Sequence, residues 1–170
     1  MSASTATETA TETKKNTHRA TVAEKYLTFT LGAETYGLAV LRIKEIIQHQ
    51  QITAVPQVPS YIKGVLNLRG KVIPVIDMRV KFCLGHEQVD ERTCIIVVQV
   101  QCENRGQVLV GLIVDAVEEV LNINAAQIEE KPDLGGRVDN QFIHGIAKVE
   151  GKVKTLLDIE TIILGENMQF

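Results

Sequence analysis

The sequence contains no tryptophan, and aromatic residues make up only 4% of its 170 residues. A surface that stacks on bases or sugars would have to be built from three tyrosines and four phenylalanines. The formal net charge is −3 at pH 7, whereas dedicated nucleic-acid-binding domains are usually strongly basic. The composition therefore argues against a nucleic-acid partner.

Long apolar runs are also missing. The longest, Cys94–Val98, has the length of a strand, whereas a membrane-spanning helix needs ~20 residues. No apolar segment typical of a secretory signal stands near the N-terminus, and the three widely spaced cysteines fit reduced thiols in a cytosol. We therefore expect a cytoplasmic protein with no direct membrane insertion.

Residues that could form a catalytic site are scarce. Nucleophilic catalysis needs a Ser, Cys or Thr beside a positioned base, and no motif surrounds any of the four histidines. The Gly-Lys pairs at 70–71 and 151–152 are typical of hairpin turns and not of a phosphate-binding loop. We therefore predict no enzymatic activity, no catalytic residues and no cofactor.

A zinc site is the sharpest chemical alternative. Soft ligands of the kind that zinc prefers stand close together in the sequence at Cys83, His86, Cys94 and Cys102. An apolar strand separates Cys94 from Cys102, however, and would hold its ends about 25 Å apart. We expect no metal site, with Cys83 and Cys94 serving as small hydrophobic residues.

The chain divides into a tail and a strand-rich body. Nine of residues 1–22 are Ser or Thr, and hardly any could anchor a core. Such a segment cannot offset its own ordering entropy, so we expect a disordered N-terminal tether. The body beyond it alternates apolar and polar residues between turn signals, which favours short strands and small barrels.

One segment of the body predicts a hairpin followed by a helix. Residues 64–77 are typical of two strands joined by a turn at Arg69–Lys71. Asp77 is a plausible N-cap for a short helix directly after them. Arg79 and Lys81 are expected to lie on the side of that helix that faces water.

The second half of the body repeats the first. Residues 37–47 align with 111–121, and residues 64–78 align with 145–159, so that glycines and aspartates fall at equivalent turns and caps.

The repeat predicts two similar units. We place the first β-barrel unit at 23–86 and the second at 87–170. A C-terminal helix at 152–164 is expected to pack back on the first unit.

Two charged residues stand out in this repeat. Glu45 lies inside an aliphatic run and aligns with Glu119, and Arg69 lies at the hairpin turn where the second copy has Glu150. The simpler interpretation is a solvated strand and a solvated turn. The functional interpretation is an ion pair at a binding surface, because the planar guanidinium pairs with a carboxylate and still offers donors to a partner.

Three segments, residues 36–46, 62–79 and 110–117, carry a resemblance to a known family. The middle one contains Asn-Leu-Arg-Gly and then Val-Ile-Pro-Val-Ile-Asp, which is close to a signature of the CheW family. Members of this family are bacterial chemotaxis adaptors that couple transmembrane chemoreceptors to the histidine kinase CheA. The resemblance covers about residues 25–164, and a chain of this length has no room for an added kinase or receiver domain.

The resemblance implies an all-β fold of two tandem SH3-like five-stranded barrels with a hydrophobic groove between them. It implies a cytoplasmic protein recruited to membrane-associated chemoreceptor arrays. The implied partners are the regulatory domain of CheA and the cytoplasmic tips of methyl-accepting chemoreceptors. Glu45 and Arg69 are carried over as a polar pair on a partner surface, and the residues implied for the receptor-binding groove are Ile43, Gly64, Val117 and Val120.

Other functions remain open from the sequence. The main alternative is a tandem-barrel module outside chemotaxis that binds a small molecule or a peptide, which would need a closed cavity with converging polar groups. An enzyme would instead need a pocket with strongly perturbed titratable groups.

Overall fold

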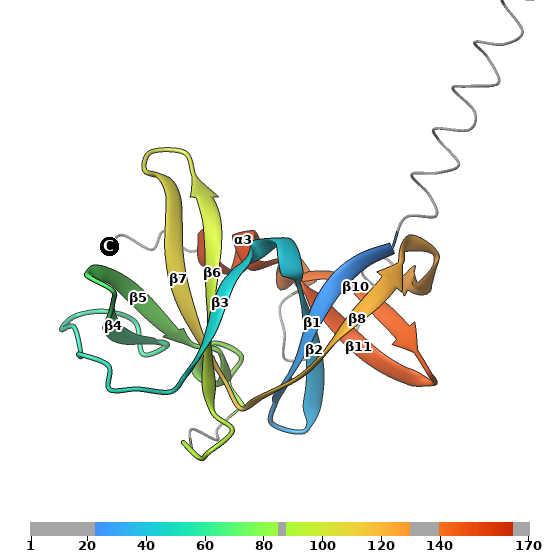
Figure 1. Cartoon of the computed structure of the whole chain (residues 1–170), viewed down its shortest axis with the longest axis horizontal. Coiled ribbons are helices and arrows are strands. Elements are labelled where there is room, and N and C mark those ends of the chain that lie inside the picture. Colours follow the sequence, from blue (N-terminus) through green and yellow to red (C-terminus); the bar gives the residue numbers. More distant parts are fainter. Residues whose placement is uncertain (1–22, 85–87, 130–139, 165–170) are drawn as a thin grey trace, which may run out of the picture.

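The computed structural model describes residues 23–84, 88–129 and 140–164. These residues form two antiparallel-rich β-sheets that lie side by side (Figure 1). The first sheet has the strand order β3-β6-β7-β5-β4, with strands β3 (Ile43–Gln48), β4 (Ile62–Leu68), β5 (Lys71–Asp77), β6 (Cys94–Cys102) and β7 (Gly106–Val114).

The second sheet has the order β8-β1-β2-β11-β10-β9. Its strands are β1 (Ala23–Leu31), β2 (Glu34–Ala39), β8 (Ala116–Asn124), β9 (Ile128–Glu129), β10 (Ile143–Val149) and β11 (Lys152–Leu157). The helical segments are short, with α2 (Met78–Lys81), α3 (Ile159–Leu164) and the 3₁₀ turns η1 (Val40–Arg42), η2 (Ala125–Gln127) and η3 (Asn140–Phe142). The predicted all-β class is confirmed.

The sheets also confirm the internal repeat. The β4–β5 and β10–β11 hairpins turn at Arg69–Gly70 and at Glu150–Gly151, and all four residues have positive φ, between 51° and 86°. Strand β5 pairs in parallel with β7, and β11 pairs in parallel with β2. The two sheets are therefore two copies of one arrangement, although neither closes into a complete barrel, because their edge strands are not hydrogen-bonded to each other.

The expected boundary between residues 86 and 87 does not follow the sheets. The β1–β2 hairpin belongs to the second sheet, where β1 pairs with β8 and β2 pairs with β11. The β6–β7 hairpin belongs to the first sheet, between β3 and β5. In the first sheet the β6–β7 hairpin lies between β3 and the β5–β4 hairpin, and in the second sheet the β1–β2 hairpin lies between β8 and strands β11, β10 and β9. The hairpin of the first sheet, β6–β7, comes after the other strands of that sheet in the chain. The hairpin of the second sheet, β1–β2, comes before the other strands of that sheet.

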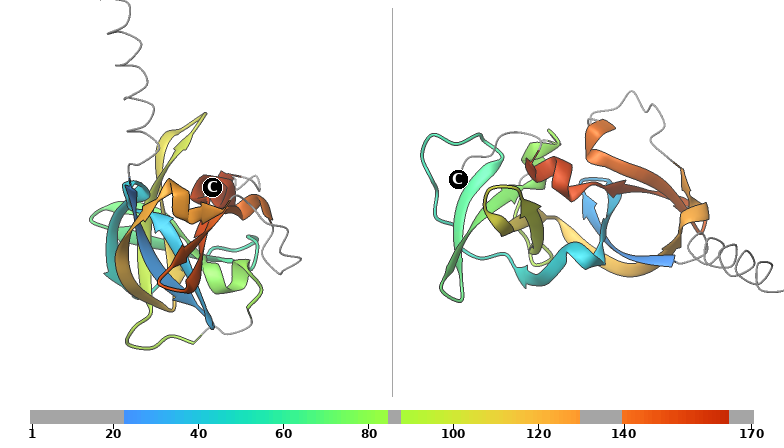
Figure 2. Two further views of the ribbon diagram at one scale, coloured as in Figure 1. Left: turned by 90° about the vertical axis from the view of Figure 1, so that its right-hand side faces the viewer. Right: turned by 90° about the horizontal axis from the view of Figure 1, so that it is seen from above.

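The helix expected at 152–164 is wrong in its first half. Residues 152–157 form β11, and the helix α3 begins only at Ile159. Three apolar side chains of α3, Ile159, Ile162 and Ile163, are buried. In Figure 2 the helix lies near the middle of the molecule, between the two sheets.

The main core lies between the two sheets. It takes buried side chains from both of them and from α3, among them Phe29, Leu38, Ile96, Leu112 and Ile162. A chain of ring contacts runs through it from Phe29 to Tyr36, Phe82 and Phe142, with centroids 5.7 to 6.3 Å apart. This shared core makes the sheets one packed body, and each sheet adds a smaller cluster of its own.

Candidate partner-binding surface

Arg69 and Glu45 form a two-fold hydrogen-bonded ion pair. Arg69 Nη1 donates to Glu45 Oε1 and Nη2 donates to Oε2, each at 2.8 Å. The Arg69 side chain is 75% exposed and that of Glu45 is 24% exposed. These bonds and the negative charge of Glu45 raise the pKa of Arg69 above its usual value, so the guanidinium keeps its charge at any physiological pH.

The backbone of the turn holds Arg69 in place. Arg69 has φ 51°, a left-handed conformation that is uncommon outside glycine and asparagine. Two successive residues with positive φ define the tight hairpin turn whose twist matches that of the strands, and Gly70 N donates to the side chain of Asn67 at 2.9 Å. The predicted hairpin thus carries Arg69 toward Glu45 on β3.

A bulge in β3 separates the charged pair from the aliphatic residues of the same strand. Ile43 lies opposite Val98 and Ile46 opposite Ile96, whereas Glu45 lies opposite Val97, and the register shifts between Ile43 and Glu45. Side chains opposite each other across two strands share a face. Val98 and Ile96 belong to the central core and Val97 to the first sheet's own cluster, so Ile43 and Ile46 point to the inter-sheet side and Glu45 to the other.

Strand β8 repeats this arrangement in the second sheet. Val117 lies opposite Phe29 and Val120 opposite Leu27, and the register again shifts between these two pairs. Phe29 and Leu27 both belong to the central core. Val117 and Val120 therefore occupy in β8 the places that Ile43 and Ile46 occupy in β3.

Exposure divides these four aliphatic residues into two kinds. Ile43 and Val117 are half-buried and pack against the central core. Ile46 and Val120 are 44% and 54% exposed. Ile46 was missed in the sequence, although its alignment with Val120 in the repeat was available as a signal.

Gly64 lies elsewhere and acts through its backbone. It has φ +143°, and a Cβ atom there would lie 1.9 Å from the carbonyl oxygen of Thr53. Thr53 and Val65 exchange backbone hydrogen bonds of 2.9 Å, so only a glycine lets the two segments come this close. Gly64 is buried and shapes the segment that covers it.

Arg79 was expected to face water, and the structure shows the opposite. Its side chain is 2% exposed and pairs with Asp77 and with Asp115, each at 3.0 Å. Burial alone would lower the pKa of Arg79, but its hydrogen bonds and charge interactions with these two carboxylates outweigh that effect and raise it. Asp77 also caps α2 by accepting from Arg79 N at 2.9 Å, which confirms the predicted cap.

Lys81 does not point into water either. Its Nζ lies 4.0 Å from the centre of the Tyr61 ring and 5.3 Å from that of Phe142, which is the geometry of a cation–π contact. Its position explains how a charged residue fits beside the central core.

The three cysteines considered for zinc, all of them among the described residues, form no cluster. Cys94 and Cys102 are the first and last residues of β6, Cys83 is exposed, and His86 lies outside the described residues. Within the described ranges, no three His, Cys, Asp or Glu side chains cluster in the way that a metal ion needs.

The structure also shows one hollow on the first sheet and tests the expectation about membrane-spanning helices. A hollow lies where β5 and β7 diverge before their first paired residues, and it is lined by Lys71–Pro74, Arg105 and Gln107–Leu109. None of the helices in the described part of the chain has both the length and the apolar character needed to cross a membrane.

Comparisons with known proteins place the chain in one family. Residues 25–166 match the family described as "CheW-like domain". The "Chemotaxis protein CheW" of Klebsiella aerogenes is 38% identical over 148 residues, which cover 87% of this chain and 86% of that protein. The protein of the same name from Bacillus subtilis is 32% identical over 146 residues, covering 86% and 90%.

A solved structure shows the same fold. The scaffolding protein TtCheW from Thermoanaerobacter tengcongensis matches with a TM-score of 0.75 at 35% identity, covering 83% of this chain and 92% of that one. The chain belongs to the CheW family of chemotaxis proteins.

Proposed function

We propose that this chain is a chemotaxis adaptor that couples chemoreceptor cytoplasmic tips to the histidine kinase CheA. Proteins named for chemotaxis align along most of the chain, and a solved relative is a scaffolding protein. In this proposal the chain has no catalytic role of its own and needs no cofactor. It works in the cytoplasm, where receptors and kinase recruit it to membrane-associated arrays.

The observation that carries the proposal is that β3 and β8 turn equivalent aliphatic residues to the same side of the molecule. Ile43 and Ile46 on β3, and Val117 and Val120 on β8, form matching aliphatic pairs turned to the inter-sheet side. A helical hairpin docks through aliphatic positions along a concave strip, so we assign the receptor tip to these strands. Gly64 lies outside this surface, on β4, where it allows the close approach of Thr53.

The Arg69–Glu45 pair supports a second contact. It lies on the other side of β3 from the aliphatic residues, and an exposed pair of this kind adds little to folding. Both carboxylate oxygens of Glu45 are occupied by Arg69, while the guanidinium has five N–H donors and two of them are used. The free donors suit a carboxylate or carbonyl group on a partner.

The test is a three-component assembly with purified proteins. The full chain is mixed with the CheA regulatory domain, with a receptor cytoplasmic fragment, and with both. We expect it to retain each partner separately and to bring receptor fragment and kinase domain into one complex. Retention of neither partner would contradict the proposal and would favour a binding module outside chemotaxis.

A further inference from the structure

The chain passes between the two sheets at two crossovers that are equivalent in the repeat. One is η1, between β2 and β3, and the other is Asp115, between β7 and β8. Each crossover carries a charged residue that pairs with a short helix. Asp115 pairs with α2, which follows β5, and Arg42 of η1 pairs with α3, which follows β11, the equivalent of β5 in the repeat. In both cases the partner stands two residues after the aspartate that precedes the helix, at Arg79 after Asp77 and at Glu160 after Asp158.

At the second crossover Arg79 is buried, whereas the side chain of Asp115 is 30% exposed, and both residues have further partners. Arg79 Nη1 lies 3.0 Å from Asp115 Oδ1 and also donates to the carbonyl of Gln88 at 2.6 Å. Asp115 Oδ2 accepts from Gly32 N at 2.6 Å, and Asp115 N donates to the carbonyl of Thr30 at 3.1 Å. Asp115 thus joins α2 of one sheet to the β1–β2 turn of the other.

The pair at the first crossover has the opposite polarity and is exposed. Arg42 Nη2 lies 2.6 Å from Glu160 Oε1, with side chains 45% and 37% exposed. Here the cation stands on the crossover and the anion on the helix, whereas the Asp115–Arg79 pair places them the other way round. A pair whose two side chains are both exposed is screened by salt and is worth little. Breaking the Arg79–Asp115 pair costs more, because it leaves the buried guanidinium of Arg79 without one of its carboxylates.

We propose that these two ion pairs are latches that fix the orientation of the two sheets, with Arg79–Asp115 as the permanent latch and Arg42–Glu160 as the one that opens. Ile43 follows Arg42 directly, and Val117 follows Asp115 by two residues. The latched residues are therefore positioning residues for the two half-buried aliphatic side chains that point to the inter-sheet side. Opening the exposed latch frees η1 and the start of β3 while the Asp115 crossover stays fixed.

The latch is tested by hydrogen exchange on the full chain without any partner. Glu160→Gln removes the charge and keeps the size, and we expect amides of residues 40–46 to exchange about two- to fivefold faster, as loss of an exposed pair allows. Combining Arg42→Glu with Glu160→Arg reverses the pair and should restore wild-type exchange. Unchanged exchange in Glu160→Gln, or no recovery in the reversed pair, overturns the proposal.

A matched control separates the latch from a general effect of charge. Lys148 and Glu129 form another exposed pair, 3.1 Å apart, within the second sheet. Glu129→Gln should leave exchange at 40–46 unchanged, and an equal effect there would overturn the assignment.

For the permanent latch, Asp115→Asn keeps an acceptor for Gly32 N, and we expect exchange in α2 and at Gly32 to rise about tenfold or more. The proposed roles would be contradicted if exchange in α2 and at Gly32 rose less in Asp115→Asn than exchange at 40–46 rises in Glu160→Gln.

The positioning role rests on the proposed function and has a readout of its own. Receptor-fragment affinity should fall in Glu160→Gln and return in the reversed pair. If exchange responds as expected and affinity stays constant, the positioning role is overturned and the latch stands. A wild-type chain that does not bind the fragment would contradict the proposed function, and exchange would still decide about the latch.

Discussion

Arg69 and Glu45 join the two edge strands of the first sheet. Glu45 is on β3, at one edge, and Arg69 is in the turn that begins from β4, at the other edge. These strands are not paired through their backbones, and two side-chain hydrogen bonds of 2.8 Å connect them instead. Because the pair is exposed, this connection is also available to a partner.

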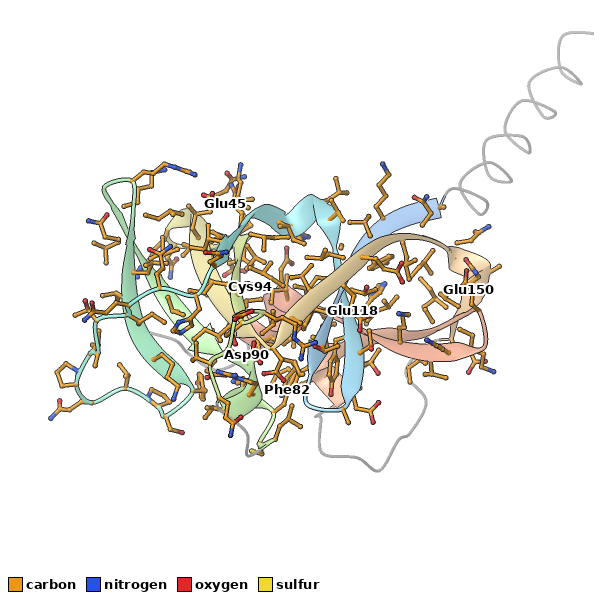
Figure 3. All side chains as sticks on the ribbon, turned by 60° about the horizontal axis from the view of Figure 1, so that its bottom comes forward. Glu45, Phe82, Asp90, Cys94, Glu118 and Glu150 are labelled. Atoms are coloured by element: carbon orange, nitrogen blue, oxygen red, sulfur yellow. The ribbon has the colours of Figure 1, made fainter. Side chains whose placement is uncertain are left out.

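Replacing Arg69 tests whether its guanidinium contributes to assembly. Arg69→Asn keeps a residue that tolerates positive φ, so the turn should persist while the guanidinium is lost. We expect assembly with receptor fragment and kinase domain to weaken about tenfold or more, as for an arginine at an interface centre. The control is Glu150→Asn, at the equivalent turn of the second sheet, far from Glu45 (Figure 3). An equal loss in both variants, measured by titration calorimetry, would contradict the assignment.

Charge reversal tests whether the two residues act as a pair. Arg69→Glu places two negative charges together and should weaken assembly more than Arg69→Asn does. Adding Glu45→Arg restores opposite charges and should recover part of the loss. The measurement is a double-mutant cycle on kinase binding and on receptor binding separately. Strict additivity would mean that the residues do not interact in the function.

Val120 offers the cleanest probe of the aliphatic surface, since Val117 is half-buried against the core and its replacement would disturb packing. Val120→Asp should lower receptor affinity by about tenfold, or about 1.4 kcal/mol, without changing the circular dichroism spectrum. Val89, 56% exposed against 54% for Val120, provides the matched control as Val89→Asp. Wild-type affinity in Val120→Asp would remove β8 from the receptor surface.

Gly64→Ala is expected to destabilise the fold by about 2–4 kcal/mol, because the new Cβ meets a backbone oxygen in a conformation that alanine avoids. Gly70→Ala is its control, since Gly70 also has positive φ but a Cβ there has nothing within 4 Å. That variant should lose only the conformational part, about 1–2 kcal/mol. Urea unfolding measures both, and equal losses would show that the contact with Thr53 is not the cause.

The raised pKa of Tyr26 predicts that the free energy of unfolding falls at alkaline pH. Burial, together with the negative charge of Glu24 and the hydrogen bond to it, raises the pKa of Tyr26 from 10.0 to about 12. The unfolded chain loses this proton first, so the contribution is complete below pH 10 and disappears as the pH rises toward 12. Between about pH 9 and about pH 11, Tyr26→Phe should lose less unfolding free energy than the wild type. Parallel curves for the two proteins would count against this role.

Local features of the fold could be predicted from the sequence. The hairpin with its Arg69–Gly70 turn, the Asp77 cap and the internal repeat all depend on residues that are close together in the chain. The ion pair of Glu45 and Arg69 was one of two interpretations of these residues, the other being a solvated strand and a solvated turn, and the contact spans 24 residues.

Long-range features could not be predicted in this way. Periodicity shows that 23–39 forms strands, but it does not show that they pair with β8 and β11 rather than with β3. Arg79 is buried because Asp115, 36 residues away, supplies a second carboxylate. Nothing near Arg79 in the sequence indicates that partner.

The central claim is that one chain holds receptor and kinase at the same time through different surfaces. The most direct test measures the affinity of the chain for the CheA regulatory domain by fluorescence anisotropy, with and without a saturating receptor fragment. The proposal predicts that the fragment leaves this affinity unchanged or increases it. A receptor fragment that displaces the kinase domain competitively would place both partners on one surface and contradict the proposal.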